Sequence, residues 1–311
     1  MLYLIGLIFF SATYFLLGGE TSDTLPRSLK ELWNLAHIAY FFLLLYLIGY
    51  IPSLKSISAK ILIPGLILFS LLLGGLIELC QYATGRTPDG QDIVLDLTGG
   101  LLALVFLGRF SKPFNRGLLL SFRIVLLTFL AVQSTPFAVA VVDEIIAYRQ
   151  FPVLISNDTP FELDRWRGNS DIEIDRIESA NLLKIRLSPE HRYPGTSLGY
   201  FPGDWSGYNL LVIRFYNPSP LPLNVSVRVH DRAHESSYSY QDRFNLNTRV
   251  QPGWSDLKIG LNQIRNAPQD REMNMREISD LSVFTNKLNK ERVVYINKIY
   301  LSRKTGISTK K

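Results

Sequence analysis

The chain has 311 residues, of which 47% are hydrophobic and 19% are charged, and its formal net charge is +6. Its Lys and Arg residues form no long basic run and alternate with Asp and Glu in the second half, which argues against nucleic-acid binding. The single cysteine, Cys80, excludes both an intrachain disulfide and a zinc site built on paired cysteines.

The composition changes near residue 150. Before that point apolar runs of about 18 to 25 residues recur with few charges, and this length crosses a hydrocarbon core of about 30 Å. We therefore predict an α-helical membrane domain of about five transmembrane helices, followed by an all-β, jelly-roll-like sandwich. The predicted boundaries are 1–135 for the membrane domain, 136–150 for an interfacial helix or linker, 151–304 for the sandwich and 305–311 for a disordered tail.

The first predicted span, residues 1–18, lacks the basic start and the cleavage site of a secretory signal. We interpret it as a retained helix, with a cleaved signal as the alternative. The other spans are predicted at 33–51, 61–82, 91–108 and 118–133. Gly74–Gly75 and Gly99–Gly100 give two of them small-residue faces suited to close helix packing. An amphipathic interfacial helix is predicted at 137–150, with an extension of the fifth span as the alternative.

The charges of the short loops predict the orientation in the membrane. The second loop carries Lys55 and Lys60, the fourth carries Arg109, Lys112 and Arg116, and neither loop contains an acid. Basic loops stay in the cytoplasm, so we expect a cytoplasmic N-terminus and an extracytoplasmic second half.

The second half contains short runs with strand character, separated by Pro, Gly, Asn and Asp at the spacing of an all-β sandwich. These runs are 152–156, 171–177, 182–188, 208–216, 223–231, 242–250, 255–261, 278–284 and 292–302.

Unusual polar residues interrupt the apolar runs of the first half, where charge is costly and is often functional. Glu78 and Gln81 are three residues apart and Asp92 and Asp96 are four apart, so each pair shares one helix face. With the predicted orientation, the candidate ligand-binding residues meet near the outer leaflet. They are His37, Glu78, Gln81, Arg86, Asp89, Asp92 and Asp96.

Two interpretations of this cluster stay open. It is either a pocket for a polar headgroup, with Glu78, Asp92 and His37 as candidate acids or bases, or a buried network that fixes helix packing. For Arg86 a role as an interfacial anchor is a further alternative.

In the sandwich, aromatic residues are candidates for stacking on sugar rings. They are Trp205, Tyr208, Tyr238, Tyr240 and Trp254. Asp242, Arg243 and Asn245 are candidates for a polar edge of the same site, and an Arg–Asp pair that pins a loop is the alternative. His230, Asp231 and His234 lie at a strand end and turn, where residues four apart need not share a face, so we predict no metal site there.

The order His37, Glu78-x-x-Gln81, Gly85-Arg86, Asp89, Asp92 and Asp96-x-x-Gly99 resembles the VanZ-like family of membrane proteins over about residues 1–130. Two departures stand out. Asp96 occupies a position where the family usually has Asn, and Lys30 replaces the Asp-Lys pair often found ahead of the His. The resemblance implies a role in the bacterial cell envelope, since the founding member is associated with low-level teicoplanin resistance, and it implies no settled reaction.

The second half is similar to carbohydrate-binding jelly rolls, on the segments 209–231, 240–254 and 294–302. The combined expectation is a multi-pass protein of the bacterial cytoplasmic membrane that recognises a glycan, a lipid-linked precursor or a glycopeptide at the outer face. One alternative is an enzyme that acts on a lipid-linked saccharide or phosphate through Glu78, Arg86 and Asp92. A second is an anchored scaffold. The expected partners are membrane lipids and a glycan or precursor, with no cofactor and no metal.

Overall fold

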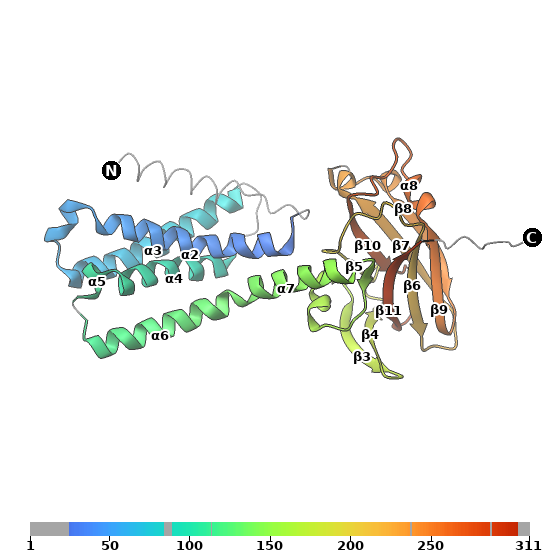
Figure 1. Ribbon diagram of the computed structural model, residues 1–311, viewed down its shortest axis with the longest axis horizontal. Coiled ribbons are helices and arrows are strands. Elements are labelled where there is room, and N and C mark those ends of the chain that lie inside the picture. Colours follow the sequence, from blue (N-terminus) through green and yellow to red (C-terminus); the bar gives the residue numbers. More distant parts are fainter. Residues whose placement is uncertain (1–24, 84–88, 113, 237, 287, 304–311) are drawn as a thin grey trace, which may run out of the picture. The chain divides into compact units, whose positions relative to one another are not determined.

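The computed structural model describes residues 25–83, 89–112, 114–236, 238–286 and 288–303 (Figure 1). The chain divides into two compact units, Met1–Ala140 and Val141–Lys311, and we describe each by itself. The predicted first span, Arg86 and the predicted tail at 305–311 lie outside the described residues.

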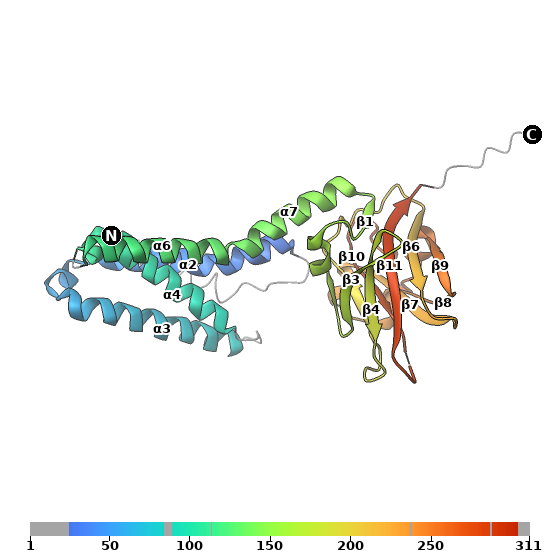
Figure 2. The ribbon, with the colours of Figure 1, turned by 90° about the horizontal axis from the view of Figure 1, so that it is seen from below.

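The first unit is helical, and α7 continues into the second unit (Figures 1 and 2). Each of the four predicted spans that fall on described residues coincides with a helix. The helices are α2 Arg27–Gly49, α3 Ala59–Ala83, α4 Gly90–Phe106, α5 Gly108–Ser111, α6 Arg116–Gln133 and α7 Thr135–Gln150, with a short 3-10 helix η1 at Pro52–Ser56.

In the described part of the chain, three helical stretches are long and apolar enough to cross a membrane: Arg27–Gly49, Ala59–Ala83 and Arg116–Gln150. The last of them joins α6 and α7, because Ser134 between them keeps helical angles of φ −85° and ψ −8°. This continuity favours the alternative in which 137–150 extends the fifth span. α4 is shorter, with 17 residues.

Side-chain caps fix where two of the helices begin. Asp89 Oδ1 accepts a hydrogen bond from the backbone N–H of Gln91 at 2.8 Å, at the start of α4. Asn115 does the same for Gly117 at the start of α6. Such caps satisfy N–H groups that have no partner inside the helix. At the other end of α4, Arg123 of α6 donates to the Val105 carbonyl at 3.2 Å.

α4 packs against α2, α3 and α6, and its glycines allow the close approach. A Cβ atom at Gly99 would lie 2.2 Å from the Ile38 carbonyl oxygen of α2, and one at Gly100 would lie 2.8 Å from Ser70 Oγ of α3. On α3, a Cβ at Gly74 would lie 2.6 Å from Asp96 Oδ2, whereas one at Gly75 would meet nothing within 4 Å. Three of the four predicted glycines therefore lie at tight helix contacts.

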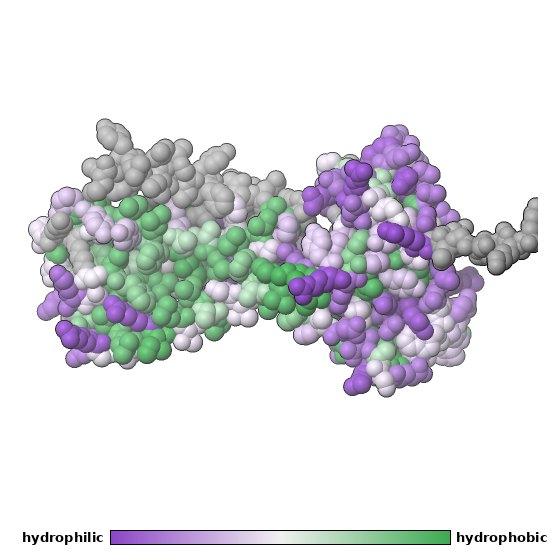
Figure 3. Space-filling view, in the orientation of Figure 1, coloured by the Kyte–Doolittle hydropathy of each residue, from purple (hydrophilic) through white to green (hydrophobic). Residues whose placement is uncertain are grey.

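On the face shown in Figure 3, the helical unit exposes many apolar residues. Large hydrophobic side chains are more than half exposed along α3 and α6, among them Ile61, Leu72, Leu79 and Val125. In a helix that packs only against its own unit, such residues would turn inward. A continuous exposed apolar surface marks an interaction with a membrane or another apolar partner.

The α2–α4 contact yields a first test. We expect Gly99→Ala to lower the free energy of unfolding by about 1 to 3 kcal/mol, because the added methyl group overpacks a backbone contact. The matched control is Gly75→Ala, which adds the same methyl group to open space and should be neutral or stabilising by up to about 1 kcal/mol. Thermal unfolding of the purified protein in detergent measures both, and equal effects would contradict the described packing.

The second unit is a sandwich of two antiparallel sheets (Figures 1 and 2). One sheet has the order β3-β4-β11-β6-β9, with β1 also paired to β11, and the other has the order β2-β5-β10-β7-β8. The strands are β1 Val153–Ile155, β2 Trp166–Gly168, β3 Asp171–Ile177, β4 Ala180–Leu187, β5 Gly195–Leu198, β6 Leu210–Asn217, β7 Leu223–Asp231, β8 Phe244–Val250, β9 Gly253–Gly260, β10 Ile278–Phe284 and β11 Arg292–Ser302.

Each strand-like run found in the sequence overlaps one of these strands, with the ends of β4, β6 and β9 shifted by one or two residues, whereas β2 and β5 were not predicted. Both are short and contain a glycine. Short helices connect the strands: η2 Pro160–Arg165, η3 Arg232–Ser236, η4 Tyr240–Asp242 and α8 Leu261–Arg265.

The core lies between the two sheets and follows from the side-chain period of two in a strand. In β7, Val225, Val227 and Val229 are buried, whereas Ser226 and Arg228 between them face outward and are partly exposed. The same alternation places Phe244 and Val250 of β8 in the core. The outward residues of the five-stranded sheet are thereby free to form a polar surface.

A buried ion pair attaches the last part of α7 to the sandwich unit. Arg165 of η2 is fully buried, and its NH2 lies 2.6 Å from Asp143 Oδ1 of α7. The same guanidinium also donates to the carbonyl oxygens of Leu154 and Asp143. These bonds satisfy a charge that would otherwise be very costly to bury.

Candidate functional site

The predicted polar cluster of the helical unit is formed by side chains from α2, α3 and α4. His37 of α2 is 1% exposed, and its Nδ1 lies 2.8 Å from Asp96 Oδ1 while its Nε2 lies 3.6 Å from Asp92 Oδ2. Asp92 and Asp96 thus share the face of α4 that the spacing predicts. The imidazole ring lies between two carboxylates.

Glu78 and Gln81 are buried on the neighbouring α3. Glu78 Oε2 accepts the backbone N–H of Asp89 at 2.8 Å, which ties the end of α3 to the start of α4. Two buried oxygens, Glu78 Oε1 and Asp96 Oδ2, have no hydrogen-bond partner among the described residues. Buried polar groups without partners are uncommon and are found at functional sites, which fits the acid–base interpretation of Glu78, Asp92 and His37. The buried contacts between helices fit the packing interpretation equally, so both stay predictions.

The sandwich carries a groove of about 510 Å³ on the outer face of its five-stranded sheet. Ligand sites of small molecules fall in this size range. We call it the outer groove. It is lined by Gly168, Asn169, Tyr193, Gly195, Thr196, Ser197, Ser226, Arg228, Tyr240, Arg243, Asn245, Asn247, Ser282, Phe284 and Asn286.

Strand register builds the floor of the outer groove. Arg228 of β7 faces Ser282 of β10, which in turn faces Ser197 of β5. Arg228 NH2 donates to Ser282 Oγ at 2.8 Å, and Ser282 Oγ lies 2.7 Å from Ser197 Oγ. The three side chains form one polar row across three strands.

A second row runs parallel to the first. Ser226 of β7 faces Asn247 of β8 on one side and Phe284 of β10 on the other. Ser226 Oγ donates to Asn247 Oδ1 at 2.6 Å, which turns the Asn247 amide into a defined orientation. The outer groove therefore offers hydroxyl and amide groups at fixed positions on adjacent strands.

Aromatic rings border these polar rows. Phe284 lies over Gly195, where an added Cβ would come within 2.3 Å of Phe284 Cβ, so only glycine fits there. Tyr193 packs edge-on against Phe284, with ring centroids 6.2 Å apart. Tyr240 is 65% exposed, and the Arg243 guanidinium carbon lies 5.2 Å from its ring centroid. These rings provide apolar faces at the edge of a polar surface.

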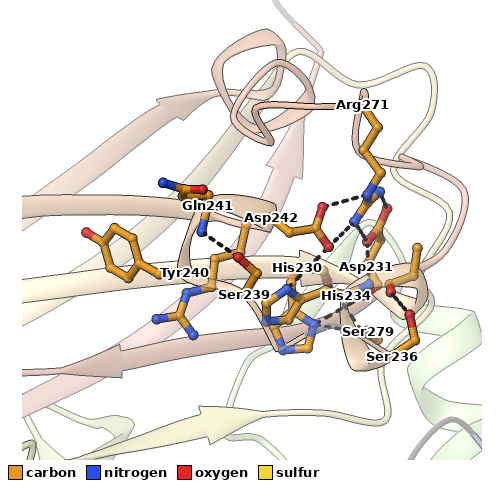
Figure 4. Close-up of polar contacts among 12 residues, drawn as sticks. His230, Asp231, His234, Ser236, Ser239, Tyr240, Gln241, Asp242, Arg271 and Ser279 are labelled. Atoms are coloured by element: carbon orange, nitrogen blue, oxygen red, sulfur yellow. Dashed lines mark hydrogen bonds and ion pairs between the residues drawn. The ribbon is translucent and has the colours of Figure 1, made fainter.

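The segment that carries Tyr240 and Arg243 is held by Arg271 (Figure 4). Arg271 NH1 lies 2.6 Å from Asp231 Oδ2 at the end of β7, and Arg271 Nε lies 2.6 Å from Asp242 Oδ1 at the end of η4. The backbone N–H of Asn274 also donates to Asp231, at 2.6 Å. One guanidinium group thus joins two carboxylates from different elements. We call this set the Arg271 tether.

Titratable groups in and beside the Arg271 tether have shifted pKa values; His234 lies beside it, since its backbone N–H donates to Asp231 Oδ1 at 3.3 Å. Burial alone would raise the pKa of Asp231, but the hydrogen bonds from Arg271 and Asn274 outweigh it and lower this pKa. Burial lowers the pKa of His234, and the nearby charges of His230 and Arg243 lower it further. In the folded protein, Asp231 is therefore held as a carboxylate and His234 as a neutral ring.

The structure places the predicted sandwich residues in different surroundings. Tyr240, Arg243 and Asn245 line the outer groove. Asp242 belongs to the Arg271 tether, where its arginine partner is Arg271. Tyr238, on the same segment, is 73% exposed and does not line the outer groove.

The remaining aromatic candidates lie away from the outer groove. Trp205 is fully buried in the core, so its ring is not available to a sugar. Tyr208 packs against the core beside Phe151. Trp254 lies on β9 of the other sheet, beside Tyr216.

Several groove residues were not predicted, including Arg228, Ser282, Ser197, Asn247 and Phe284. The outward positions of β7 and β8 could have been found from the period of two, since they alternate with Val and Leu. His230 and His234 stack with ring centroids 4.6 Å apart. Among the residues that the structure describes, no group of three His, Cys, Asp or Glu side chains could hold a metal ion.

No family model matches the chain, and no curated protein matches it. The VanZ-like resemblance therefore stays a prediction.

Solved structures similar to the chain include carbohydrate-binding modules. The Family 11 module from Clostridium thermocellum in complex with a β-1,3-1,4-mixed-linked tetrasaccharide has 14% identity and a TM-score of 0.39, covering 49% of this chain and 94% of that one. A non-crystalline cellulose specific module of family 28 has 9% identity and a TM-score of 0.36, covering 49% and 93%. An exo-β-agarase has 14% identity and a TM-score of 0.38, covering 47% and 24%. Because the identities and TM-scores are low, these similarities carry no argument about what the sandwich unit binds.

The Arg271 tether predicts a pH dependence. The pKa values of His234 and Asp231 are both lowered by folding, so their contributions are complete above the ordinary values of 6.5 and 3.8 and are lost as the pH falls through the folded values. We expect hydrogen exchange in peptides covering 232–243 to be slow at pH 7 to 8, after correction for the intrinsic rate. It should accelerate below pH 6.5, first through His234 and then through Asp231.

The variant Arg271→Ala leaves Asp231 buried without its cation, which should cost about 3 kcal/mol and expose the same peptides already at pH 7. Arg265→Ala, which truncates an exposed arginine of α8, is the matched control and should behave as the wild type. Protection that stays unchanged in Arg271→Ala would show that the tether does not hold this segment.

Proposed function

We propose that the sandwich unit binds a glycan in the outer groove. The observation that carries this proposal is the pair of polar rows on adjacent strands, bordered by the rings of Tyr193, Tyr240 and Phe284. A sugar presents hydroxyl groups at its rim and C–H groups on its faces. It is recognised by donors and acceptors in fixed positions together with an apolar ring.

The fixed orientation of the groove side chains supports this proposal. Ser282 Oγ accepts from Arg228 at 2.8 Å, and Asn247 Oδ1 accepts from Ser226 at 2.6 Å, so these groups are ordered by neighbours within the sheet. A site arranged before binding loses less side-chain entropy when a ligand enters. A Cβ atom at Gly168 or Gly195 would clash with the neighbouring strand, so these glycines let β2, β5 and β10 pack closely beside the outer groove.

We also propose that the apolar helices cross a bacterial cytoplasmic membrane, with the N-terminus in the cytoplasm and the sandwich outside. The support is the length and composition of Arg27–Gly49, Ala59–Ala83 and Arg116–Gln150, and the basic loops on one side of the predicted spans. The glycan would then be an envelope polymer or a lipid-linked precursor. A VanZ-like membrane domain is consistent with this placement.

Glycan binding predicts the effect of two groove variants. We expect Tyr240→Ala and Asn247→Ala each to weaken binding at least about tenfold, which is about 1.4 kcal/mol, because one removes an apolar face and the other an oriented amide. The measurement is binding of the purified full-length protein, in detergent, to an array of neutral and acidic glycans, followed by titration of the best ligand.

Tyr238→Ala is the matched control, because it removes an exposed tyrosine of the same segment that does not line the outer groove. It should leave the affinity unchanged. Absence of binding to every glycan on the array would refute glycan binding in the outer groove. Equal affinity in Tyr240→Ala, Asn247→Ala and the wild type would refute it as well.

The membrane placement predicts thiol accessibility. In a background with Cys80→Ala, Ser236→Cys should react with an impermeant thiol reagent added to intact cells, because Ser236 is an exposed residue of the sandwich unit. Ser58→Cys, an exposed position in the predicted cytoplasmic loop, should react only after the membrane is opened. Labelling of Ser58→Cys but not Ser236→Cys in intact cells would reverse the proposed orientation.

A further inference from the structure

The outer groove has an uneven charge. Among the described residues, its lining contains two arginines, Arg228 from β7 and Arg243 just before β8, and no Asp or Glu. A groove that only binds neutral sugars needs no such excess, because hydroxyl groups are recognised by neutral donors and acceptors as well. The two guanidinium groups therefore indicate a ligand that carries an acceptor group other than neutral hydroxyls.

Arg243 is the less satisfied of the two. Its Nε is buried and has no hydrogen-bond partner among the described residues. Its guanidinium carbon lies 5.2 Å from the centroid of the Tyr240 ring, so the Tyr240 ring covers one face of the group. Burial lowers the pKa of Arg243, and the positive charge of Arg228 lowers it further. An arginine with an unused N–H in a groove is suited to an anionic oxygen.

Arg228 is oriented along the floor of the outer groove. Its Nε and NH2 donate to Ser282 Oγ at 3.1 and 2.8 Å, and its guanidinium carbon lies 5.9 Å from the centroid of the Phe284 ring. Asp280, outside the lining, approaches Arg228 NH2 only to 3.9 Å, and His230 approaches the same carboxylate to 3.7 Å. Ser282 Oγ donates to Asp280 Oδ1 at 2.6 Å, so this carboxylate and Arg228 share one hydroxyl group.

Two of the nearby acids are already neutralised outside the outer groove. Asp231 and Asp242 both form short contacts with Arg271 in the Arg271 tether. Asp280 is then a single carboxylate beside two arginines, so the outer groove keeps a net positive charge. In a partly enclosed site it acts more strongly than on an open surface.

From these contacts we propose that the outer groove selects acidic glycans, with a carboxylate or phosphate substituent held between Arg228 and Arg243 and a sugar ring against Tyr240. This inference rests on the proposed glycan binding and names the chemical class of the ligand. The shared chemistry is an anionic oxygen group on a saccharide, and the two sources, a uronate and a sugar phosphate, are separated by the test.

The experiment uses the full-length protein in detergent and compares three kinds of glycan on the same array: neutral, uronate-containing and phosphorylated. An oligogalacturonate and its methyl ester form a matched pair, since they differ in charge and share the backbone. We expect acidic glycans to bind at least tenfold more tightly than neutral ones, with an affinity that falls as salt is raised. The better of the two acidic classes identifies the source of the charge.

Variants of the arginines connect the preference to the outer groove. Arg243→Gln and Arg228→Gln should each remove at least tenfold of the acidic preference, and Arg243→Lys should retain part of it because the charge is kept. Arg249→Gln is the control, since it removes the same charge from an outward position of β8 that does not line the outer groove. It should leave the preference unchanged.

The outcomes separate the two proposals. Tight binding of neutral glycans, unaffected by Arg243→Gln and lost in Asn247→Ala, would overturn the acidic preference and leave glycan binding in place. Binding to no glycan of any kind would overturn both. An acidic preference that persists in Arg228→Gln and Arg243→Gln would place the anionic contact elsewhere and overturn this inference alone.

Discussion

The outer groove depends on one constraint, the period of two along the strands of the five-stranded sheet. Val225, Val227 and Val229 must face the other sheet to fill the core, and this commits Ser226 and Arg228 to the outer face. Register then sets which side chains meet. A shift of one residue in β7 would bury the guanidinium and expose the valines, so the same burial that stabilises the sandwich fixes the chemistry of its outer surface.

Strand register alone would place Arg228, Ser282 and Asn247, but it would not place Tyr240 or Arg243. Tyr240 lies in η4, and Arg243 lies just before β8, so both depend on the connection between β7 and β8. Arg271 holds the two ends of this connection through Asp231 and Asp242. A charged group was needed there because Asp231 is fully buried, and an unpaired buried carboxylate would be strongly destabilising. The stability of the loop and the shape of the outer groove are therefore set by the same ion pairs.

Much of this arrangement could be read from the sequence, and the missed parts have physical reasons. Alternating apolar residues identified the long strands, and Tyr240, Arg243 and Asn245 were named as candidates for a glycan site. Trp205 was a candidate as well, but residue type does not tell whether a loop aromatic packs into the core. β2 and β5 were missed because Gly168 and Gly195, which carry no side chain, weaken the local strand signal.

Arg228 illustrates a different limit. Its alternation with valines showed that it faces outward, but its partner Ser282 is on β10, and only the pairing of β7 with β10 brings the two together. In the helical unit, the spacing of residues along the sequence was enough to predict which side chains lie close together. His37, Asp92 and Asp96 were expected to converge, because helix periodicity places Asp92 and Asp96 on one face and the predicted topology places His37 at the same depth.

The two polar clusters of the protein differ in a way that bears on function. The outer groove is open, and Arg243 Nε has no hydrogen-bond partner among the described residues, whereas the helical cluster is closed by the packing of α2, α3 and α4. Gly99 allows α4 to approach the backbone of α2, and this approach also brings Asp96 to within 2.8 Å of His37. Gly74 leaves room for the other Asp96 oxygen on α3. The close approach at Gly99 and the His37–Asp96 contact lie at the same α2–α4 interface, so any chemistry of Glu78 or Asp92 has to operate within that packing.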